Sequence, residues 1–379
     1  MPLFYTLRAV KLVALIPACS VLFFYSVGTP AAAEDASIDR LLNKLPSPEK
    51  LIKPSVRKAL EQPDPALKDP LATEIVRAAM MRNFSRVLNL SRKLTERYPH
   101  SAGAQCLRGV IAYDLRQFGE ASASFRTAAK IQPAFAFAHF GMAAIEAVQG
   151  HYASAIPHLQ RVAELEPKAA VVYYYLSDCA LRAARKQESA DYARKAAALA
   201  PADVDMWVQL AKAERALGHS EATLNAIAKA AEVSPDNGIM LAILGFSYIN
   251  LNRIPQAIAP LERAAKRMPR DYLVHSQLGY CLMIVGQVDS AVGHLRKGAS
   301  LNSSYGPVWE HLGVAYQKQG HHRDAVSALE KATKLLPSSQ LAWQNLSRAY
   351  QASGRAVDAQ RAAAQAQQLS AAKPNKKKA

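Results

Sequence analysis

Residues able to do chemistry are scattered thinly along this chain. Of its ten histidines only His321 and His322 are adjacent, and they fall where a turn between two helices is expected. A histidine pair is a weak signal for a metal site, and no phosphate-binding glycine loop, HExxH motif or nucleophile elbow occurs in the sequence. The sequence therefore predicts no catalytic residue, no cofactor and no metal ion.

The cysteines give no sign of a disulfide framework. Cys179 and Cys281 are 102 residues apart, which is three times 34, and Cys106 lies at another position of the same 34-residue period. If that period reflects stacked units, the Cα atoms lie much farther apart than the roughly 7 Å limit for a disulfide. We therefore expect three buried free thiols.

A proline recurs every 34 residues along most of the chain. Ser303 takes the one missing place, and the register does not slip over nine units from Lys68 onward. The series consists of Pro99, Pro133, Pro167, Pro201, Pro235, Pro269 and Pro337. A fixed period of this length indicates a protein built from stacked repeats.

The positions within each unit predict two helices. With the proline numbered 32, positions 8, 20 and 27 are mostly Gly, Ala or Ser, which lets two helices cross closely. Position 15 is usually glycine, with Asn252 as one substitute, and these residues adopt the left-handed conformation that ends a helix at little cost. Because proline cannot continue the second helix, each unit reads as a helix–turn–helix.

This pattern resembles the tetratricopeptide repeat family, whose consensus has W, L, G and Y followed by A, F, A and P. The best copy, at 306–339, carries Trp309, Leu312, Gly313, Tyr316, Gly320, Ala325, Leu329, Ala332 and Pro337. The resemblance implies an all-α fold, a right-handed superhelical solenoid of about nine repeats over 68–371. The expected units are 68–101, which is degenerate, 102–135, 136–169, 170–203, 204–237, 238–271, 272–305, 306–339 and 340–371.

Residues 1–33 have the pattern of a secretory signal peptide. Arg8 and Lys11 precede an apolar run over 12–27, and three alanines precede Glu34. An uncleaved N-terminal membrane anchor is the main alternative, although a run of 16 residues is short against the roughly 20 that span a bilayer. Lipid attachment at Cys19 is a third.

The segments that flank the array are too short for a further domain. Residues 34–67 form a linker with five prolines, and 372–379 form a basic tail. With a leader at the N-terminus, the array is expected to be exported, to a periplasmic or other extracytoplasmic location, with anchoring to the inner membrane by the N-terminus as a variant.

The chain is strongly basic, with a net charge of +17. A basic repeat protein can bind RNA, but no pair of polar residues recurs at fixed positions from unit to unit, and export also disfavours nucleic acid. The charge instead favours acidic partners or an anionic membrane surface, with an ordinary solvated face as the alternative.

The resemblance also implies where a partner would bind. In the family, positions 2, 5, 9, 12 and 13 of the first helices line a groove. Bulky apolar residues at these positions give the predicted partner-binding groove: Phe137, Phe140, Tyr174, Phe246, Ile249, Tyr280, Met283 and Ile284. Burial by neighbouring units, or contact with a second copy, is the alternative. The eighth unit is polar, with Glu310, Gln317 and Lys318, and no unit has the position-5 lysine that the family's clamp on a peptide carboxylate requires.

The sequence as a whole predicts a non-catalytic scaffold of the cell envelope that binds a protein or peptide partner through an apolar or amphipathic segment. A chaperone or accessory subunit that holds unfolded exported chains is the alternative from another class. A chaperone should suppress the aggregation of unrelated client proteins, whereas a scaffold should co-purify with one stoichiometric partner.

Overall fold

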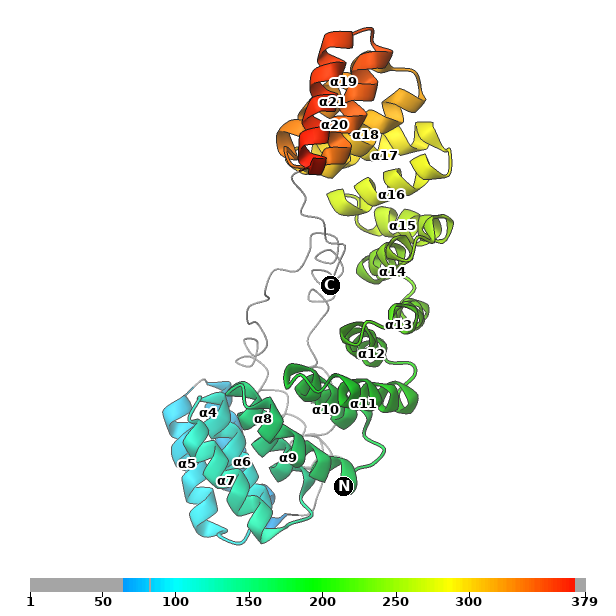
Figure 1. Ribbon diagram of the computed structural model, residues 1–379. Helices are drawn as coiled ribbons and strands as arrows, with labels where there is room; N and C mark the ends of the chain where they lie inside the picture. The colour runs from blue at the N-terminus through cyan, green and yellow to red at the C-terminus, as the bar shows by residue number, and fades with distance from the viewer. Residues whose placement is uncertain (1–63, 82, 372–379) are drawn as a thin grey trace. The chain divides into compact units, whose positions relative to one another are not determined.

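The computed structural model describes residues 64–81 and 83–371, and this part of the chain contains eighteen α-helices, one short 3-10 helix and no strand. The all-α expectation is confirmed (Figure 1). The predicted leader, most of the linker and the basic tail lie outside the described residues. None of the described helices is both long and apolar enough to cross a membrane.

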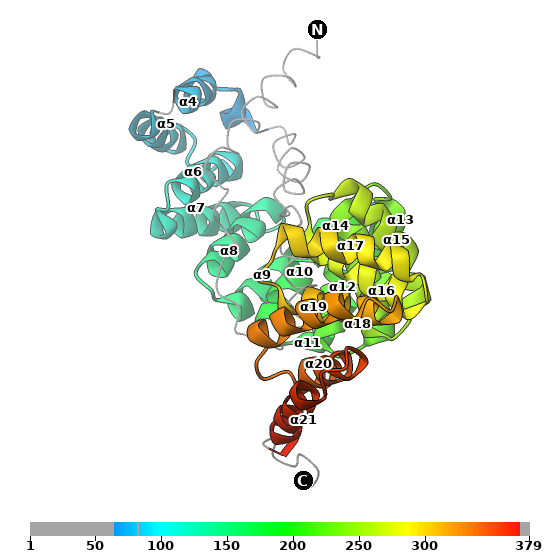
Figure 2. The same ribbon diagram turned by 90° about the horizontal axis from the view of Figure 1, so that it is seen from above.

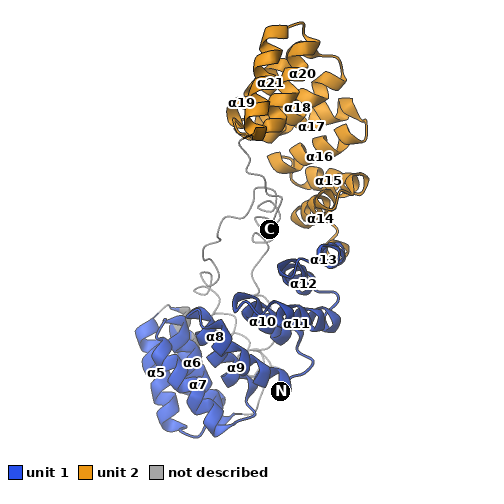
Figure 3. Cartoon of the chain, viewed as in Figure 1, with its two compact units in different colours: residues 1–30, 46–230 blue, residues 31–45, 231–379 orange. Residues whose placement is uncertain are grey.

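The described chain forms two compact units, 64–230 and 231–371, which are coloured separately in Figure 3. The first unit contains a 3-10 helix, η2 (Pro65–Lys68), followed by α4 (Pro70–Met80), α5 (Phe84–Arg97), α6 (Ala102–Asp114), α7 (Phe118–Ile131), α8 (Ala136–Val148), α9 (Tyr152–Leu165), α10 (Ala170–Arg182), α11 (Lys186–Leu199) and α12 (Val204–Ala216). The boundary falls inside α13 (Ser220–Val233).

The second unit continues with four more helix pairs. They are α14 (Gly238–Asn250), α15 (Ile254–Arg267), α16 (Tyr272–Ile284), α17 (Val288–Leu301), α18 (Gly306–Lys318), α19 (His322–Leu335), α20 (Gln340–Ala352) and α21 (Ala356–Ala371). In repeats one to four and six to nine the two helices of a repeat contact each other. Within each unit the second helix contacts the first helix of the next repeat, as Figure 2 shows for α4 to α7.

The helix boundaries follow the 34-residue period. In repeats two to eight the first helix covers positions 1–13 and the second covers positions 17–30. The degenerate first repeat keeps this register, although α4 is two residues shorter at its N-terminus. Ile75 occupies its position 8, where other repeats have a small residue, and is buried.

In repeats two to nine, position 15 ends the first helix in the left-handed conformation. Gly286 has φ of +86°, and the substitute Asn252 has φ of 56°. Arg116 and Ala184 hold the same position in the second and fourth repeats and take the same conformation, with φ of 58° and 60°. The geometry is therefore imposed by the repeat even where the residue does not favour it.

The close crossing within a repeat joins positions 8 and 24. A Cβ added to Gly109 would lie 2.8 Å from the ring of Phe125, and one added to Gly245 would lie 2.5 Å from Cγ of Leu261. Such distances leave no room for a methyl group. Position 8 of the ninth repeat is a serine, and its side chain makes a polar contact at the crossing. The Ser347 hydroxyl donates a hydrogen bond of 2.8 Å to the backbone carbonyl of Ala359 at position 20.

The first helix is joined to the preceding loop through position 4. The indole N–H of Trp309 donates to the carbonyl of Ser303 at 2.8 Å, and Trp207 and Trp343 make the equivalent bond to a proline carbonyl. The sequence predicts packing roles for His139 and His275 at this position. His139 places Nε2 3.1 Å from the Pro133 carbonyl oxygen, and His275 places Nε2 3.2 Å from that of Pro269, so each histidine takes the role of the tryptophan.

The expectation of three buried free thiols is confirmed. Cys106, Cys179 and Cys281 are all buried and unpaired. Burial raises the pKa of Cys179 and Cys281 to about 12, so both thiols are protonated and unreactive near neutral pH.

Candidate binding surface

The first helices of neighbouring repeats touch one another within each unit. In the first unit α6 contacts α8, and α10 contacts α12. In the second unit α14, α16, α18 and α20 form a continuous series of such contacts. The first helices thus form one side of each unit, which we call the inner face.

The three predicted groove residues of the first unit belong to aromatic clusters. Phe137 lies edge-on to Phe125, with ring centroids 6.3 Å apart. Phe140 and Tyr174 both lie edge-on to Tyr175, at 5.4 and 5.5 Å. Edge-to-face pairs at such distances stabilise packing beyond the area they bury. Phe137 and Phe140 are half-buried, whereas Tyr174 is buried.

The five predicted groove residues of the second unit differ in exposure. Phe246 and Met283 are 3% and 4% exposed, so they belong to the packed interior. Ile249 and Tyr280 are half-buried, and Ile284 is 51% exposed. Tyr174, Phe246 and Met283 are therefore buried, as the alternative explanation anticipated, and offer a partner little surface.

One exposed apolar residue on this face was not among the predicted groove residues. Leu341, at position 2 of the ninth repeat, is 56% exposed. With Ile284 at position 13 of the seventh repeat, it gives the inner face of the second unit two large apolar side chains open to solvent.

Polar side chains accompany these apolar ones on α16, α18 and α20. Glu310 is 8% exposed, and the Asn345 amide donates to its Oε1 at 3.3 Å. The Gln317 amide donates to the Asn345 carbonyl at 3.1 Å. Burial raises the pKa of Glu310, and the hydrogen bond from Asn345 offsets only part of that shift.

Two further polar groups on this face have unused atoms. Within the described chain, Ser276 Oγ and His311 Nδ1 are buried without a hydrogen-bond partner. The His311 ring lies 4.8 Å from the Tyr280 ring, and burial lowers the pKa of His311 to about 4. His311 is therefore neutral at physiological pH.

Sequence reasoning missed Ser276, His311 and Asn345 for a definable reason. His311 and Asn345 lie at position 6, which is not among the groove positions of the resembled family. Ser276 does lie at position 5, but it is small and neutral. A scan for polar residues on the same helical face, at positions 5, 6 and 9, would have found all three.

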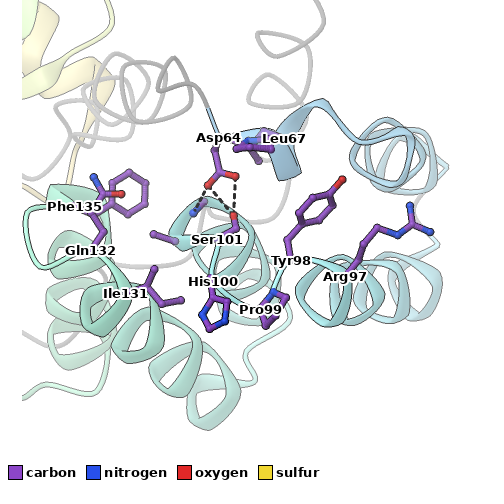
Figure 4. A pocket seen from close by; sticks show the side chains of 13 residues that line it. Asp64, Leu67, Arg97, Tyr98, Pro99, His100, Ser101, Ile131, Gln132 and Phe135 are labelled. Atoms are coloured by element: carbon purple, nitrogen blue, oxygen red, sulfur yellow. Dashed lines mark hydrogen bonds between the residues drawn. The ribbon is translucent and has the colours of Figure 1, made fainter.

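A cavity of about 620 Å³ lies at the start of the first unit (Figure 4). Its main polar group is already used, because the Asp64 carboxylate accepts hydrogen bonds from Ser101 Oγ and from the backbone N–H of Gly103 at the N-terminus of α6. Asp64 and the buried Ala66 lie within the predicted linker, so the packed array begins at least four residues before Lys68. We interpret the cavity as part of the contact between the residues before α4 and the N-terminus of α6, with a structural role.

No cluster of three or more His, Cys, Asp or Glu that could hold a metal ion occurs in residues 64–371 outside position 82. His321 and His322 lie at the turn that begins α19, as expected from the sequence.

Comparison with protein-family models matches the description "Tetratricopeptide repeat" to residues 102–135, 140–204 and 306–338. A search among curated proteins gives no match.

Among solved structures, the chain is similar to MamA, with 22% identity and a TM-score of 0.41 over 46% of this chain and 96% of that one. It is similar to YrrB, described as a TPR protein with an unusual peptide-binding site, with 19% identity and a TM-score of 0.45 over 48% and 95%. A MamA fragment from Desulfovibrio magneticus RS-1 gives 17% identity and a TM-score of 0.42 over 45% and 97%. The matched repeat models and the 34-residue helix pairs together identify tetratricopeptide repeats in this chain.

Proposed function

We propose that this protein is a non-catalytic scaffold of the cell envelope that binds a segment of a protein partner on the inner face of its second unit. Proteins of this repeat family bind peptide or protein partners. The observation that carries the proposal is the exposure of Ile284 and Leu341, at 51% and 56%, on first helices of the same unit.

Exposed apolar side chains gain free energy when a partner covers them, about 25 cal/mol for each Å² removed from water. Half-buried Tyr280 and Ile249 extend the same face with partly apolar surface. An apolar or amphipathic segment fits such a surface better than a highly charged one.

The extracytoplasmic location is part of the proposal and rests on the leader pattern of residues 1–33. The net charge of +17 is compatible with an additional weak attraction to an anionic membrane surface.

The test is a crosslinking pull-down with the full chain, comparing the native protein with an Ile284→Ser, Leu341→Ser double variant. The matched control is Val357→Ser, because Val357 is 62% exposed but lies on α21, a second helix. We expect one stoichiometric partner to be captured by the native and control proteins and lost with the double variant. Equal capture by all three would refute inner-face binding. Suppression of aggregation of unrelated clients, without a stoichiometric partner, would favour the chaperone alternative.

A further inference from the structure

Glu310 is the carboxylate that the fold leaves least compensated on the inner face of the second unit. It is 8% exposed, and it accepts a hydrogen bond of 3.3 Å from the neutral amide of Asn345. A carboxylate can accept about four hydrogen bonds. Most of its capacity is therefore unused in an environment that excludes water.

No cation offsets this charge within the described part of the chain. Glu310 forms no ion pair there, and the physical causes acting on its pKa are burial, which raises it, and the Asn345 amide. Arg348, one turn from Asn345, places Nη1 3.5 Å from the Asn345 Oδ1 and not on the carboxylate. A buried charge without a partner is strongly destabilising, even after the surrounding structure relaxes.

Two other unused polar atoms lie on the first helices of the same unit, one repeat earlier in the register than the Glu310–Asn345 pair. Glu310 at position 5 and Asn345 at position 6 of the next repeat are in contact. Ser276 and His311 hold the same two positions one repeat earlier. Ser276 is fully buried, and both Ser276 Oγ and His311 Nδ1 lack a partner. Because the His311 pKa is about 4, its ring carries no charge at neutral pH and leaves one nitrogen as an acceptor.

These groups share one chemical requirement. A carboxylate oxygen, a hydroxyl oxygen and a neutral imidazole nitrogen can all accept hydrogen bonds, and the carboxylate also attracts positive charge. A lysine ammonium offers three donors and one positive charge on an apolar four-carbon stem. The stem would lie along the surface that Tyr280 and Ile284 provide, as lysine stems commonly do against apolar residues.

We propose that Glu310, on the inner face that also carries His311 and Ser276, forms a seat for a lysine side chain carried by the apolar partner segment. The proposal rests on the proposed inner-face binding and adds a charge requirement to it. Pairing with a cation would relieve the uncompensated carboxylate, whereas an apolar or acidic residue at that point would bury it further. The site would therefore discriminate by charge as well as by shape.

The test uses the full chain and three blocked peptides that are identical except at one central position. The peptides are acetylated Leu-Ala-Phe-X-Leu-Ala-Ser amides in which X is lysine, norleucine or glutamate. Binding is measured by isothermal titration at pH 8, well above the ordinary pKa of a carboxyl group. The variants are Glu310→Gln and the control Glu262→Gln, an exposed glutamate on the second helix α15 of the same unit.

We expect the lysine peptide to bind the native protein at least about tenfold more tightly than the norleucine peptide, and the glutamate peptide to bind most weakly. Glu310→Gln should reduce the lysine preference to less than about twofold without weakening the norleucine peptide, and Glu262→Gln should leave the preference unchanged. Equal binding of the lysine and norleucine peptides to the native protein, or a lysine preference that survives Glu310→Gln, overturns the proposed lysine site but not partner binding on the inner face. Failure of all three peptides to bind overturns both.

Discussion

Two glycines seven residues apart should respond in opposite directions to the same substitution. Gly286 ends α16 with φ of +86°, whereas Gly293 lies inside α17. A Cβ added at either position meets no atom within 4 Å. Steric clash is therefore excluded at both, and only the backbone conformation distinguishes them.

The magnitudes follow from that conformation. Gly286→Ala places an L-residue in the left-handed region, which costs about 1–2 kcal/mol, and the reduced entropy of the unfolded chain returns about 0.4–1 kcal/mol. The net destabilisation is about 1 kcal/mol. Gly293→Ala removes a glycine from a helix interior and should stabilise by about 1 kcal/mol. The two variants should differ by about 2 kcal/mol.

Thermal unfolding followed by far-ultraviolet circular dichroism measures this difference. A separation of about 2 kcal/mol corresponds to a difference in Tm of roughly 4–8 °C for a domain of this size. Ala184→Gly is the reverse control, because Ala184 has φ of 60° and should gain stability as glycine. Shifts of the same sign for Gly286→Ala and Gly293→Ala would refute the assignment of position 15 as the conformational stop.

Three further predictions concern charge and processing. Glu310→Gln should raise the free energy of unfolding at pH 8 by about 1 kcal/mol, because a buried uncompensated charge is removed. Since folding raises the pKa of Glu310, this gain should vanish below the ordinary carboxyl pKa. Urea titrations of both proteins at pH 8 and pH 4 test this. His311 should make the fold acid-sensitive: with a folded pKa of about 4 against an ordinary 6.5, the unfolded chain binds the proton first, so about 3 kcal/mol is lost as the pH falls from 7 to 4. His311→Phe, which keeps a ring against Tyr280, should reduce that loss, and an unchanged pH profile would contradict the assignment. Intact-mass analysis of the exported protein should give Glu34 as the first residue, whereas residues 1–33 retained in a membrane fraction would indicate the anchor.

The fold could be predicted from the sequence because its determinants recur at fixed spacing. Small residues at position 8 face position 24, as in Gly109 with Phe125, and eight repetitions make the signal unmistakable. Arg116 and Ala184 could not be recognised as left-handed residues by type, since neither favours that conformation. Only the register of the surrounding repeats identifies their position.

The candidate site was predicted less well because it depends on distances between repeats. Met283 and Ile284 are adjacent, apolar and both at groove positions, yet one is buried and the other is 51% exposed. Which side chain a neighbouring helix covers depends on how closely the first helices lie, and the pattern of one repeat does not contain that distance. His311 was missed for a related reason: it stands out only because its Nδ1 is buried without a hydrogen-bond partner, and the sequence pattern does not show which atoms find partners.

The repeat array supplies an internal control for interpreting Glu310. Position 5 is an interior environment in both units: its other occupants include Cys106, Tyr174, Val208, Ala242 and Ser276, all buried. Glu310 is the only charged residue at position 5 in the nine repeats, so a carboxylate there departs from the rest of the column. Such departures in otherwise consistent sequences mark strained or functional sites. Because positions 8, 20, 24 and 27 hold each repeat together without position 5, the array can carry this unfavourable charge. Burying this charge then lets the site distinguish between partners, since a cationic side chain compensates the carboxylate and a neutral side chain does not.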